Sequence, residues 1–181
     1  AGIAASAPLD KTDRGLWDQI IAVNLTGPFL TLREGLARIK AAQCQQGRLI
    51  AIASMTAKRA YPYISAYAAS KHGVLGLVKS AALEVAALGT SGSESEQKNI
   101  TVNAICPGYL DTEMTQSSIA NIAEKTGLSS KQAAEKLHSF SPQKRLFTAD
   151  EVAQAALYLA SPAASGINGQ ALSIDLSLIH I

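Results

Sequence analysis

The chain has 181 residues, of which 48% are hydrophobic and 17% charged, and its net charge at pH 7 is +2. This size and composition predict one domain with a buried core and exclude a disordered chain. The weak charge forms no basic stripe, and no apolar run reaches the roughly 18 residues of a membrane span, so neither nucleic acid nor membrane is an expected partner.

Residues 10–46 predict a helical region at the start of the chain. Apolar side chains recur there at helix-like spacing, in two segments that meet near Asn24. Thr12 and Asp13 are both candidate caps of the first segment.

A strand and a second helical region follow. Gly47 breaks the first pattern, and the nearly all-apolar residues 48–54 are typical of a strand buried on both faces. A long helix is predicted for residues 66–88. The small and polar residues 89–98 then predict a flexible surface loop.

The second half of the chain continues this alternation. Residues 100–106 predict another buried strand, which Pro107 stops. Residues 109–147 are mixed and weakly helical, and we expect a mobile segment there. A short amphipathic helix is predicted for residues 150–160 and a third strand for residues 171–175.

Cys44 and Cys106 stand far apart, with no CxxC pair and no histidine spacing typical of a metal site. We expect two reduced thiols and no bound metal. No secretory signal is visible from Ala1 onward, and a cytoplasmic location is expected.

The alternation of strands and helices predicts an α/β fold with a parallel sheet that helices cover on both faces. Three strands are few for such a sheet, so we expect its remaining part to lie before Ala1. Residues 176–181 back-translate into a sequence that resembles a transposon-end adapter. We therefore expect a partial domain over residues 1–175 and a non-native tail over 176–181, the alternative being a genuine hydrophobic tail.

Tyr67 and Lys71 are the first candidate catalytic pair. A spacing of four residues places them on one helix face, one turn apart. An ammonium beside a phenol favours the phenolate and lowers the pKa of the tyrosine, which suits proton exchange with an alcohol or carbonyl oxygen. The alternative is a surface pair on an amphipathic helix.

Three further positions have both a functional and a structural interpretation. Ser54 ends a predicted strand, where its hydroxyl could bind a substrate oxygen or simply begin a turn. Asn24 interrupts an apolar helical face and could hold a relay water through its carbonyl or amide, or cap or kink the helix. Pro107 and Gly108 allow the backbone to approach a ligand closely, or form an ordinary turn.

In order and spacing, these features resemble the short-chain dehydrogenase/reductase family over residues 1–175. The resemblance implies a Rossmann-type doubly wound sheet and a nicotinamide cofactor, NAD or NADP. It implies four catalytic residues: Asn24, Ser54, Tyr67 and Lys71. It also implies eight cofactor-binding residues: Ala1, Gly2, Tyr67, Lys71, Pro107, Gly108, Leu110 and Thr112.

Within the family, Tyr67 would act as general acid or base and Ser54 would polarise the substrate oxygen. Lys71 would lower the pKa of Tyr67 and hold the nicotinamide ribose, while Asn24 would seat a relay water. Thr112 would contact the carboxamide. The family's glycine-rich pyrophosphate turn is not among these residues, so NAD and NADP are not distinguished and we expect this piece alone to bind cofactor poorly.

The stretches 69–74 and 103–108 resemble 3-oxoacyl thioester and polyketide ketoreductases, and also 3-hydroxybutyrate dehydrogenases. The latter usually carry a histidine two positions after the catalytic serine, where this chain has Thr56. A small carbonyl or alcohol substrate is therefore expected, and a CoA or carrier-protein thioester is favoured. The alternatives are a hydroxy-acid or polyol dehydrogenase and a non-catalytic nucleotide-binding scaffold.

The family commonly assembles through its two long helices. In this chain these correspond to residues 25–43 and 66–88, whose additional apolar faces fit burial against another subunit. The resemblance therefore implies a homodimer or homotetramer.

Overall fold

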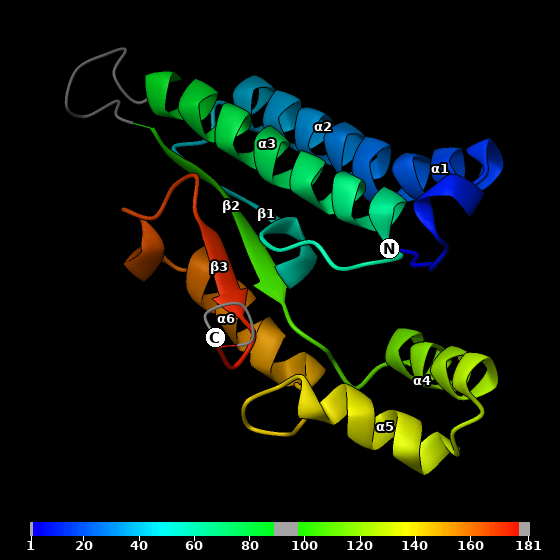
Figure 1. The fold of residues 1–181 in the computed structure, drawn as a ribbon. Helices are drawn as coiled ribbons and strands as arrows, with labels where there is room; N and C mark the ends of the chain where they lie inside the picture. Colours follow the sequence, from blue (N-terminus) through cyan, green and yellow to red (C-terminus); the bar gives the residue numbers. More distant parts are fainter. Residues whose placement is uncertain (1, 89–97, 178–181) are drawn as a thin grey trace.

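The computed structural model describes residues 2–88 and 98–177, which form a parallel three-stranded sheet between helices (Figure 1). The strands lie in the order β1 (Gln46–Ile52), β2 (Asn99–Pro107) and β3 (Ala171–Ile174). Ala104 of β2 pairs with Ala51 on one side and Ala171 on the other. All three strands run the same way, so their carboxyl ends meet at one edge, and the predicted α/β class is confirmed.

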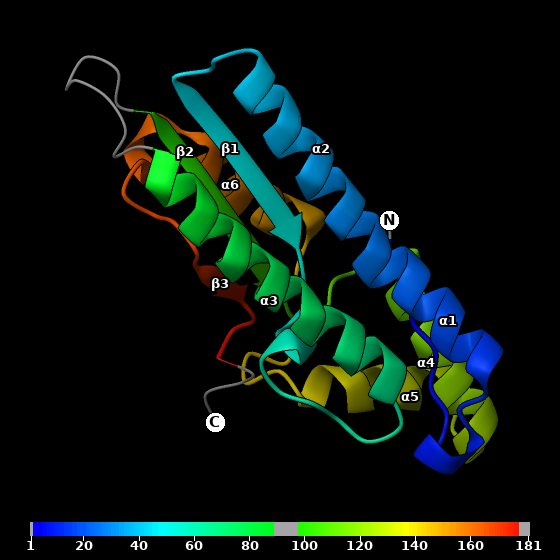
Figure 2. The same cartoon turned by 90° about the horizontal axis from the view of Figure 1, so that it is seen from above.

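Helices cover both faces of the sheet (Figures 1 and 2). Helices α2 (Gly27–Ala41) and α3 (Ser65–Leu88) lie along one face, and α6 (Ala149–Ala160) lies along the other. Helix α1 (Arg14–Ile21) extends the line of α2 and packs against α3. Within the described ranges, no helix is long and apolar enough to cross a membrane.

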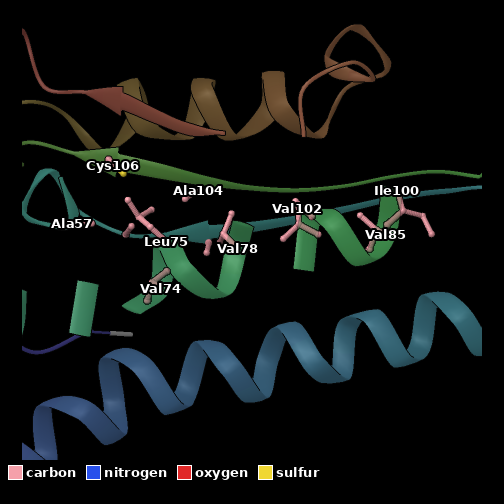
Figure 3. Packing of buried hydrophobic residues seen from close by; sticks show 12 residues of the cluster. Ala57, Val74, Leu75, Val78, Val85, Ile100, Val102, Ala104 and Cys106 are labelled. Atoms are coloured by element: carbon pink, nitrogen blue, oxygen red, sulfur yellow. The ribbon is translucent and has the colours of Figure 1, made fainter. Parts of the chain in front are cut away.

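Neighbouring residues of β2 point to opposite faces and so build two cores. Val102 and Ala104 pack with Val74 and Val78 of α3, and each of these four side chains is at most 1% exposed (Figure 3). Ile105 faces the opposite way and packs against residues of α6. Burial of one valine side chain stabilises the folded state by about 1.5–3 kcal/mol. Because β2 supplies side chains to both cores, the packing of both helical layers depends on this strand.

The first helical region has the predicted two segments. Asp13 caps α1 by accepting a hydrogen bond from the Leu16 N–H at 2.8 Å. The segments meet in a π-helical turn at Ala22–Thr26, around Asn24. Such turns are rare and cluster at functional sites, so this junction is a first indication of where the site lies.

Helix α2 ends at Ala41, earlier than the predicted residue 46. Gln43 adopts a left-handed φ of 51°, and the Cys44 N–H bonds the Ile39 carbonyl at 3.1 Å. This is the Schellman arrangement that closes a helix and reverses the chain. The reversal is needed because β1 starts at Gln46 and runs back beside α2.

Several other predictions have a clear outcome. The long helix and the second strand are confirmed to within two residues. The third strand is confirmed to within one residue and ends at Ile174, and Leu176 and Ser177 after it have left-handed φ values of 48° and 66°. Both cysteines are free thiols. The predicted loop at 89–98 lies outside the described residues except at its last position.

Residues 109–147 are more regular than the sequence predicts. They contain helices α4 (Glu113–Thr126) and α5 (Ser130–Ser139), which pack together beyond the carboxyl ends of the strands (Figure 1). Their apolar contacts form a third small core around Ile119 and Leu137. Helix α6 is capped by Thr148, just before the predicted start.

Two glycines of α3 provide a matched test of helix packing. A Cβ added to Gly73 would lie 2.8 Å from Leu25 Cδ1, whereas one added to Gly76 has no atom within 4 Å. We expect Gly76→Ala to raise the free energy of unfolding by about 0.5–1 kcal/mol through helix propensity. Gly73→Ala should be less stable than Gly76→Ala by about 1–3 kcal/mol because it overpacks the contact with Leu25. Urea unfolding of both variants checks this, and equal stabilities would contradict the close packing.

Candidate active site

Ser54 lies at the edge where the carboxyl ends of the strands meet. It follows β1 and begins a short 3-10 turn at Met55–Ala57. Its Oγ accepts a hydrogen bond from the Thr56 N–H at 3.2 Å. Because that oxygen is an acceptor toward Thr56, its own proton is free to be donated into the site. Ala53 fixes this end of β1 through a 2.7 Å bond from its N–H to the Ile105 carbonyl.

Tyr67 lies in the first turn of α3 and faces the Ser54 and Thr56 hydroxyls. Burial raises the pKa of the Tyr67 phenol, and the nearby hydroxyls of Ser54 and Thr56 oppose that rise only in part. The phenol is therefore protonated at neutral pH. A protonated phenol can give a proton to a carbonyl oxygen, so the site is set for general acid chemistry.

Lys71 lies one turn along α3 from Tyr67, as predicted. Its Nζ is 5.7 Å from the centroid of the Tyr67 ring and donates to the Ile52 carbonyl at 3.2 Å. Burial lowers the pKa of Lys71. The expected lowering of the Tyr67 pKa by Lys71 is not found, because the ammonium lies over the ring and burial of the phenol dominates.

Asn24 uses its side chain to hold another segment of the chain. Its Oδ1 accepts from the Ile3 N–H at 2.9 Å, and its Nδ2 donates to the Ile3 carbonyl at 2.8 Å. Nδ2 also reaches Ser70 Oγ at 3.4 Å, beside Lys71. Oδ1 keeps a second lone pair, so a relay water held by the side-chain amide stays a prediction. A water on the main-chain carbonyl of Asn24 stays a prediction.

Pro107 and Gly108 end β2 at the same edge of the sheet. The Gly108 N–H donates to the Ile174 carbonyl at 2.9 Å. A Cβ at Gly108 would lie 3.2 Å from the Asp175 Cα and 3.1 Å from the Phe147 ring. A side chain here would crowd the chain itself, and the close approach to a ligand that the sequence predicts stays a prediction.

The remaining predicted cofactor residues surround this edge. Leu110 pairs with Phe147 in an isolated bridge. Thr112 precedes α4 and makes no side-chain capping hydrogen bond. Gly2 lies beside Asn24, because a Cβ added to Gly2 would be 3.7 Å from the Asn24 Oδ1. Ala1 lies outside the described residues.

Other polar and aromatic side chains that the sequence did not single out line the same site. Tyr61 contacts Met55 through its hydroxyl, 4.0 Å from the sulfur. Tyr109 stacks on Phe140 with centroids 6.4 Å apart. Burial raises the pKa of Tyr109, and the nearby Tyr61 and Tyr67 raise it further. The sequence could have indicated Tyr109 as a site residue, because it directly follows Pro107 and Gly108. Nothing in the sequence near Phe140 indicates that this residue belongs to the site.

Known proteins share this arrangement of motifs. The family model described as enoyl-(acyl carrier protein) reductase matches residues 1–176. The D-beta-hydroxybutyrate dehydrogenase of Rhizobium meliloti is 41% identical over 160 residues, which are 88% of this chain and 57% of that protein. The short chain dehydrogenase/reductase astE of Aspergillus oryzae is 34% identical over 176 residues, 96% of this chain and 60% of that protein. The chain belongs to the short-chain dehydrogenase/reductase family.

A solved member of the short-chain dehydrogenase/reductase family has the same fold. The crystal structure of an actinorhodin polyketide ketoreductase variant with NADPH superposes with a TM-score of 0.87 at 30% identity, over 98% of this chain and 64% of that chain. The chain thus spans 57–64% of the lengths of these three proteins. The Rossmann-type fold expected from the sequence is confirmed.

Lys71 has the properties that a nicotinamide ribose in this family requires. Its side chain is 6% exposed, and within residues 2–88 and 98–177 it has no carboxylate partner. Its ammonium carries three donors, of which the Ile52 carbonyl takes one. A buried cation needs acceptors for the others, and ribose hydroxyls are suitable ones. The residues present therefore fit NAD or NADP.

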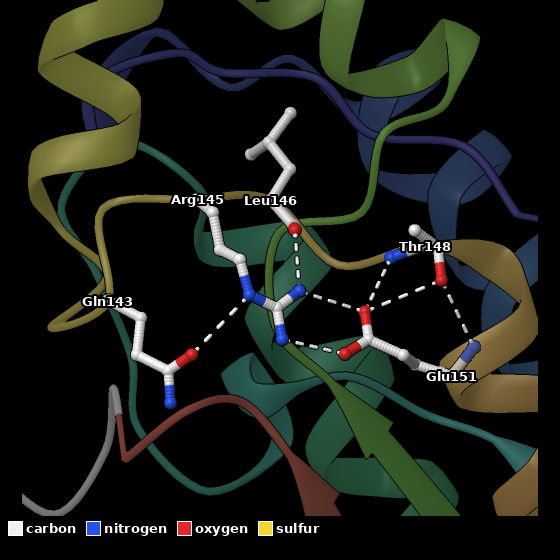
Figure 4. Close-up of polar contacts among 5 residues, drawn as sticks. All are labelled: Gln143, Arg145, Leu146, Thr148 and Glu151. Carbon is white, nitrogen blue, oxygen red and sulfur yellow. Dashed lines mark hydrogen bonds and ion pairs between the residues drawn. The ribbon is translucent and has the colours of Figure 1, made fainter.

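An ion pair holds the segment that leads from α5 to α6 in this short-chain dehydrogenase/reductase fold. The Arg145 Nη2 lies 2.7 Å from Glu151 Oε1, and Nη1 lies 3.0 Å from Oε2 (Figure 4). Glu151 Oε2 also accepts from the Thr148 N–H at 2.9 Å, as part of the α6 capping box. The hydrogen bond from Arg145 is the main reason that the pKa of Glu151 falls to about 2.

The Arg145 ion pair predicts a pH dependence. The pKa of Glu151 is lower in the folded protein than in the unfolded chain. The ion pair therefore stabilises the folded state fully above about pH 4.5, and this stabilisation is lost as the pH falls toward 2. We expect Glu151→Gln, which keeps the capping-box acceptor, to melt below the unmodified protein at pH 7. The difference should vanish between pH 4.5 and 2 in thermal melts. Glu135→Gln, exposed on α5, controls for net charge, and a difference that does not change with pH would contradict the role of the carboxylate.

Proposed function

We propose that these residues belong to an NAD- or NADP-dependent oxidoreductase that interconverts a secondary alcohol and a ketone. The observation that carries this is a protonated, buried Tyr67 phenol beside the Ser54 hydroxyl and the Lys71 ammonium. A protein that only bound nucleotide would need no proton donor there. In the reductive direction, a protonated phenol can give its proton to the carbonyl oxygen.

The chemistry follows from the placement of these three side chains. A bound nicotinamide supplies the hydride that reaches the carbonyl carbon. Ser54 donates a hydrogen bond to the carbonyl oxygen, where negative charge develops. Tyr67 gives that oxygen its proton, and Lys71 would hold the nicotinamide ribose. Gly2, Pro107, Leu110 and Thr112 remain proposed cofactor contacts at the rim of the site.

For the substrate, we propose a 3-oxoacyl thioester of CoA or of a carrier protein. Apart from Lys71, the side chains that act on the Tyr67 phenol are the uncharged hydroxyls of Ser54 and Thr56, and the cations Lys58 and Arg59 each have another contact. The Lys58 Nζ donates to Ser173 Oγ at 2.7 Å and to the Ala171 carbonyl. The Arg59 guanidinium lies 5.8 Å from the centroid of the Tyr61 ring. A neutral wall suits an esterified acid better than a free carboxylate, and the similar solved protein is a polyketide ketoreductase.

The second candidate is a 3-hydroxybutyrate-type dehydrogenase. It is favoured by the 41% identity to the Rhizobium meliloti enzyme. That substrate carries a free carboxylate, for which a site normally supplies a cation. Lys58 would have to leave β3 to reach it, so this reaction requires a rearrangement that thioester reduction does not.

Absorbance assays separate these candidates. The protein expressed from its complete reading frame is supplied with NADPH or NADH and with acetoacetyl-CoA or acetoacetate. Oxidation with acetoacetyl-CoA alone supports the thioester class, and oxidation with acetoacetate alone supports the second candidate. A folded protein that binds a nucleotide but turns over neither substrate would point to a scaffold or a different carbonyl substrate.

We also propose that the complete protein is a homodimer or homotetramer. Apolar side chains are exposed on both long helices, with Phe29 and Leu30 of α2 each 43% exposed and Leu83 of α3 76% exposed. Burial of such a patch against a second subunit is favourable. Sedimentation equilibrium tests this, and a monomer at micromolar concentration would contradict it.

A further inference from the structure

Lys58 joins the turn that carries Ser54 to a distant strand of the sheet. This 3-10 turn, Met55–Ala57, begins at Ser54 and ends at Lys58. The exposed Lys58 side chain reaches β3, where its Nζ donates to the Ser173 Oγ at 2.7 Å and to the Ala171 carbonyl. The turn follows β1, and β2 lies between β1 and β3, so these bonds tie the turn across the sheet.

The turn is closed by its own hydrogen bonds. The Ala57 N–H donates to the Ser54 carbonyl at 3.0 Å, and the Lys58 N–H donates to the Met55 carbonyl at 2.9 Å. The Ser54 Oγ accepts from the Thr56 N–H at 3.2 Å. Because these bonds fix the residues of the turn to one another, a shift at Lys58 is passed on to Ser54.

Strand β2 completes a ring of contacts between Ser54 and Lys58. Cys106 of β2 is the partner of Ser173 in the sheet register. Burial raises the pKa of the Cys106 thiol, and the nearby Lys58 ammonium and the Ser54 N–H oppose that rise. Ser54 is therefore held from two directions, through Cys106 on β2 and through Lys58 on β3.

The acceptors on β3 explain why a side chain is needed at this place. The Gln170 carbonyl accepts from the Ala104 N–H of β2 at 2.8 Å, so the next carbonyl, that of Ala171, points away from β2. In the part of the chain that the structure describes, no strand pairs with β3 on that side. Lys58 supplies the donor that a further strand would otherwise supply.

We propose that Lys58 is a positioning residue, which places the Ser54 hydroxyl at the substrate carbonyl by anchoring its turn to β3. This rests on the proposed ketone reduction, in which Ser54 donates to the carbonyl oxygen. Such a donor has to lie about 2.7–3.1 Å from the oxygen on which charge develops, so a small displacement of the turn weakens the bond. Lys58 thus acts on kcat without touching the substrate.

Lys58→Met removes the ammonium and keeps an unbranched side chain. With the complete protein, we expect kcat to fall about 3- to 10-fold, equally with acetoacetyl-CoA and with acetoacetyl-N-acetylcysteamine, while KM stays within about 2-fold. The second substrate lacks the phosphates of CoA, so an equal loss excludes a phosphate contact. Lys58→Arg keeps donors for both acceptors and should retain more than about half of kcat. Lys131→Met, exposed on α5, controls for the lost positive charge.

Ser173 gives a second test of the same tether. Ser173→Ala removes one of the two acceptors of Lys58, so kcat should fall by less than in Lys58→Met. The double variant should be no slower than Lys58→Met alone, because both changes break one contact.

Three results would overturn the positioning role alone. A loss confined to acetoacetyl-CoA would place Lys58 on the phosphates of the substrate. An unchanged kcat, whatever the melting temperature, would make Lys58 a structural contact only. Additive effects of Lys58→Met and Ser173→Ala would show that the ammonium does not act through β3. No turnover of either substrate by the unmodified complete protein would overturn the proposed function and the positioning role together. If Lys58→Met does not fold, Lys58→Gln makes the same comparisons.

Discussion

Tyr67→Phe is expected to reduce kcat for ketone reduction by about 10²- to 10⁴-fold, the usual range for a general acid. The substitution removes only the hydroxyl, so the ring keeps its place in α3 beside Lys71. Cofactor binding should be preserved because the loss falls on proton transfer. The measurement is NADPH oxidation with acetoacetyl-CoA by the complete protein, with nucleotide binding followed in parallel.

A matched control for Tyr67→Phe is available four residues earlier. Tyr63 is 65% exposed, and Tyr63→Phe should leave kcat within 2-fold. In the unmodified protein, the reduction rate should be flat through neutral pH and fall only at alkaline pH, because burial places the pKa of Tyr67 above its ordinary value of 10.0. A Tyr67→Phe variant that retained more than about a tenth of the activity would remove Tyr67 from the mechanism.

The local part of the site could be predicted from the sequence. Tyr67 and Lys71 share a helix face because four residues make about one turn, and Ser54 follows an apolar run that predicts a strand. These relations depend on short-range geometry. The prediction that this strand is buried on both faces was wrong, because β1 lies at an edge of the described sheet and Ile52 is 50% exposed. The direction of the Tyr67 pKa could not be predicted in this way, because it depends on how deeply the whole fold buries the phenol.

Contacts between distant segments could not be predicted from pattern. Tyr109 and Phe140 meet only because residues 109–147 fold into two helices that return to the sheet. The weak helical pattern of that segment reflects its small, separate core, which has few apolar residues.

Boundaries of elements were predicted well where a local signal sets them. The Asp13 cap of α1 is a side-chain hydrogen bond within one turn. The end of α2 was missed by several residues because Gln43 takes the left-handed conformation that usually marks a glycine or asparagine. The π-helical turn around Asn24 was expected only as a junction, since its extra residue per turn is set by the contact with Ile3.

Asn24→Ala is expected to lower the free energy of unfolding by about 2–4 kcal/mol, because it leaves both main-chain polar groups of Ile3 without their partners. The two bonds span 21 residues and join the segment at Ile3 to the π-helical turn. Asn24→Asp should not rescue the loss, since its second oxygen would face the Ile3 carbonyl. Urea unfolding gives the magnitude.

The control for Asn24→Ala is Asn121→Ala, at a half-buried position of α4, which should change stability by less than about 0.5 kcal/mol. The Asn24 substitution should also weaken nucleotide binding, because Ser70 and Lys71 lie on the same turn of α3 and lose the 3.4 Å contact that ties that turn to Asn24. A loss of stability below about 1 kcal/mol would show that water replaces the amide at Ile3. Asn24 would then be a helix kink with no clamping role.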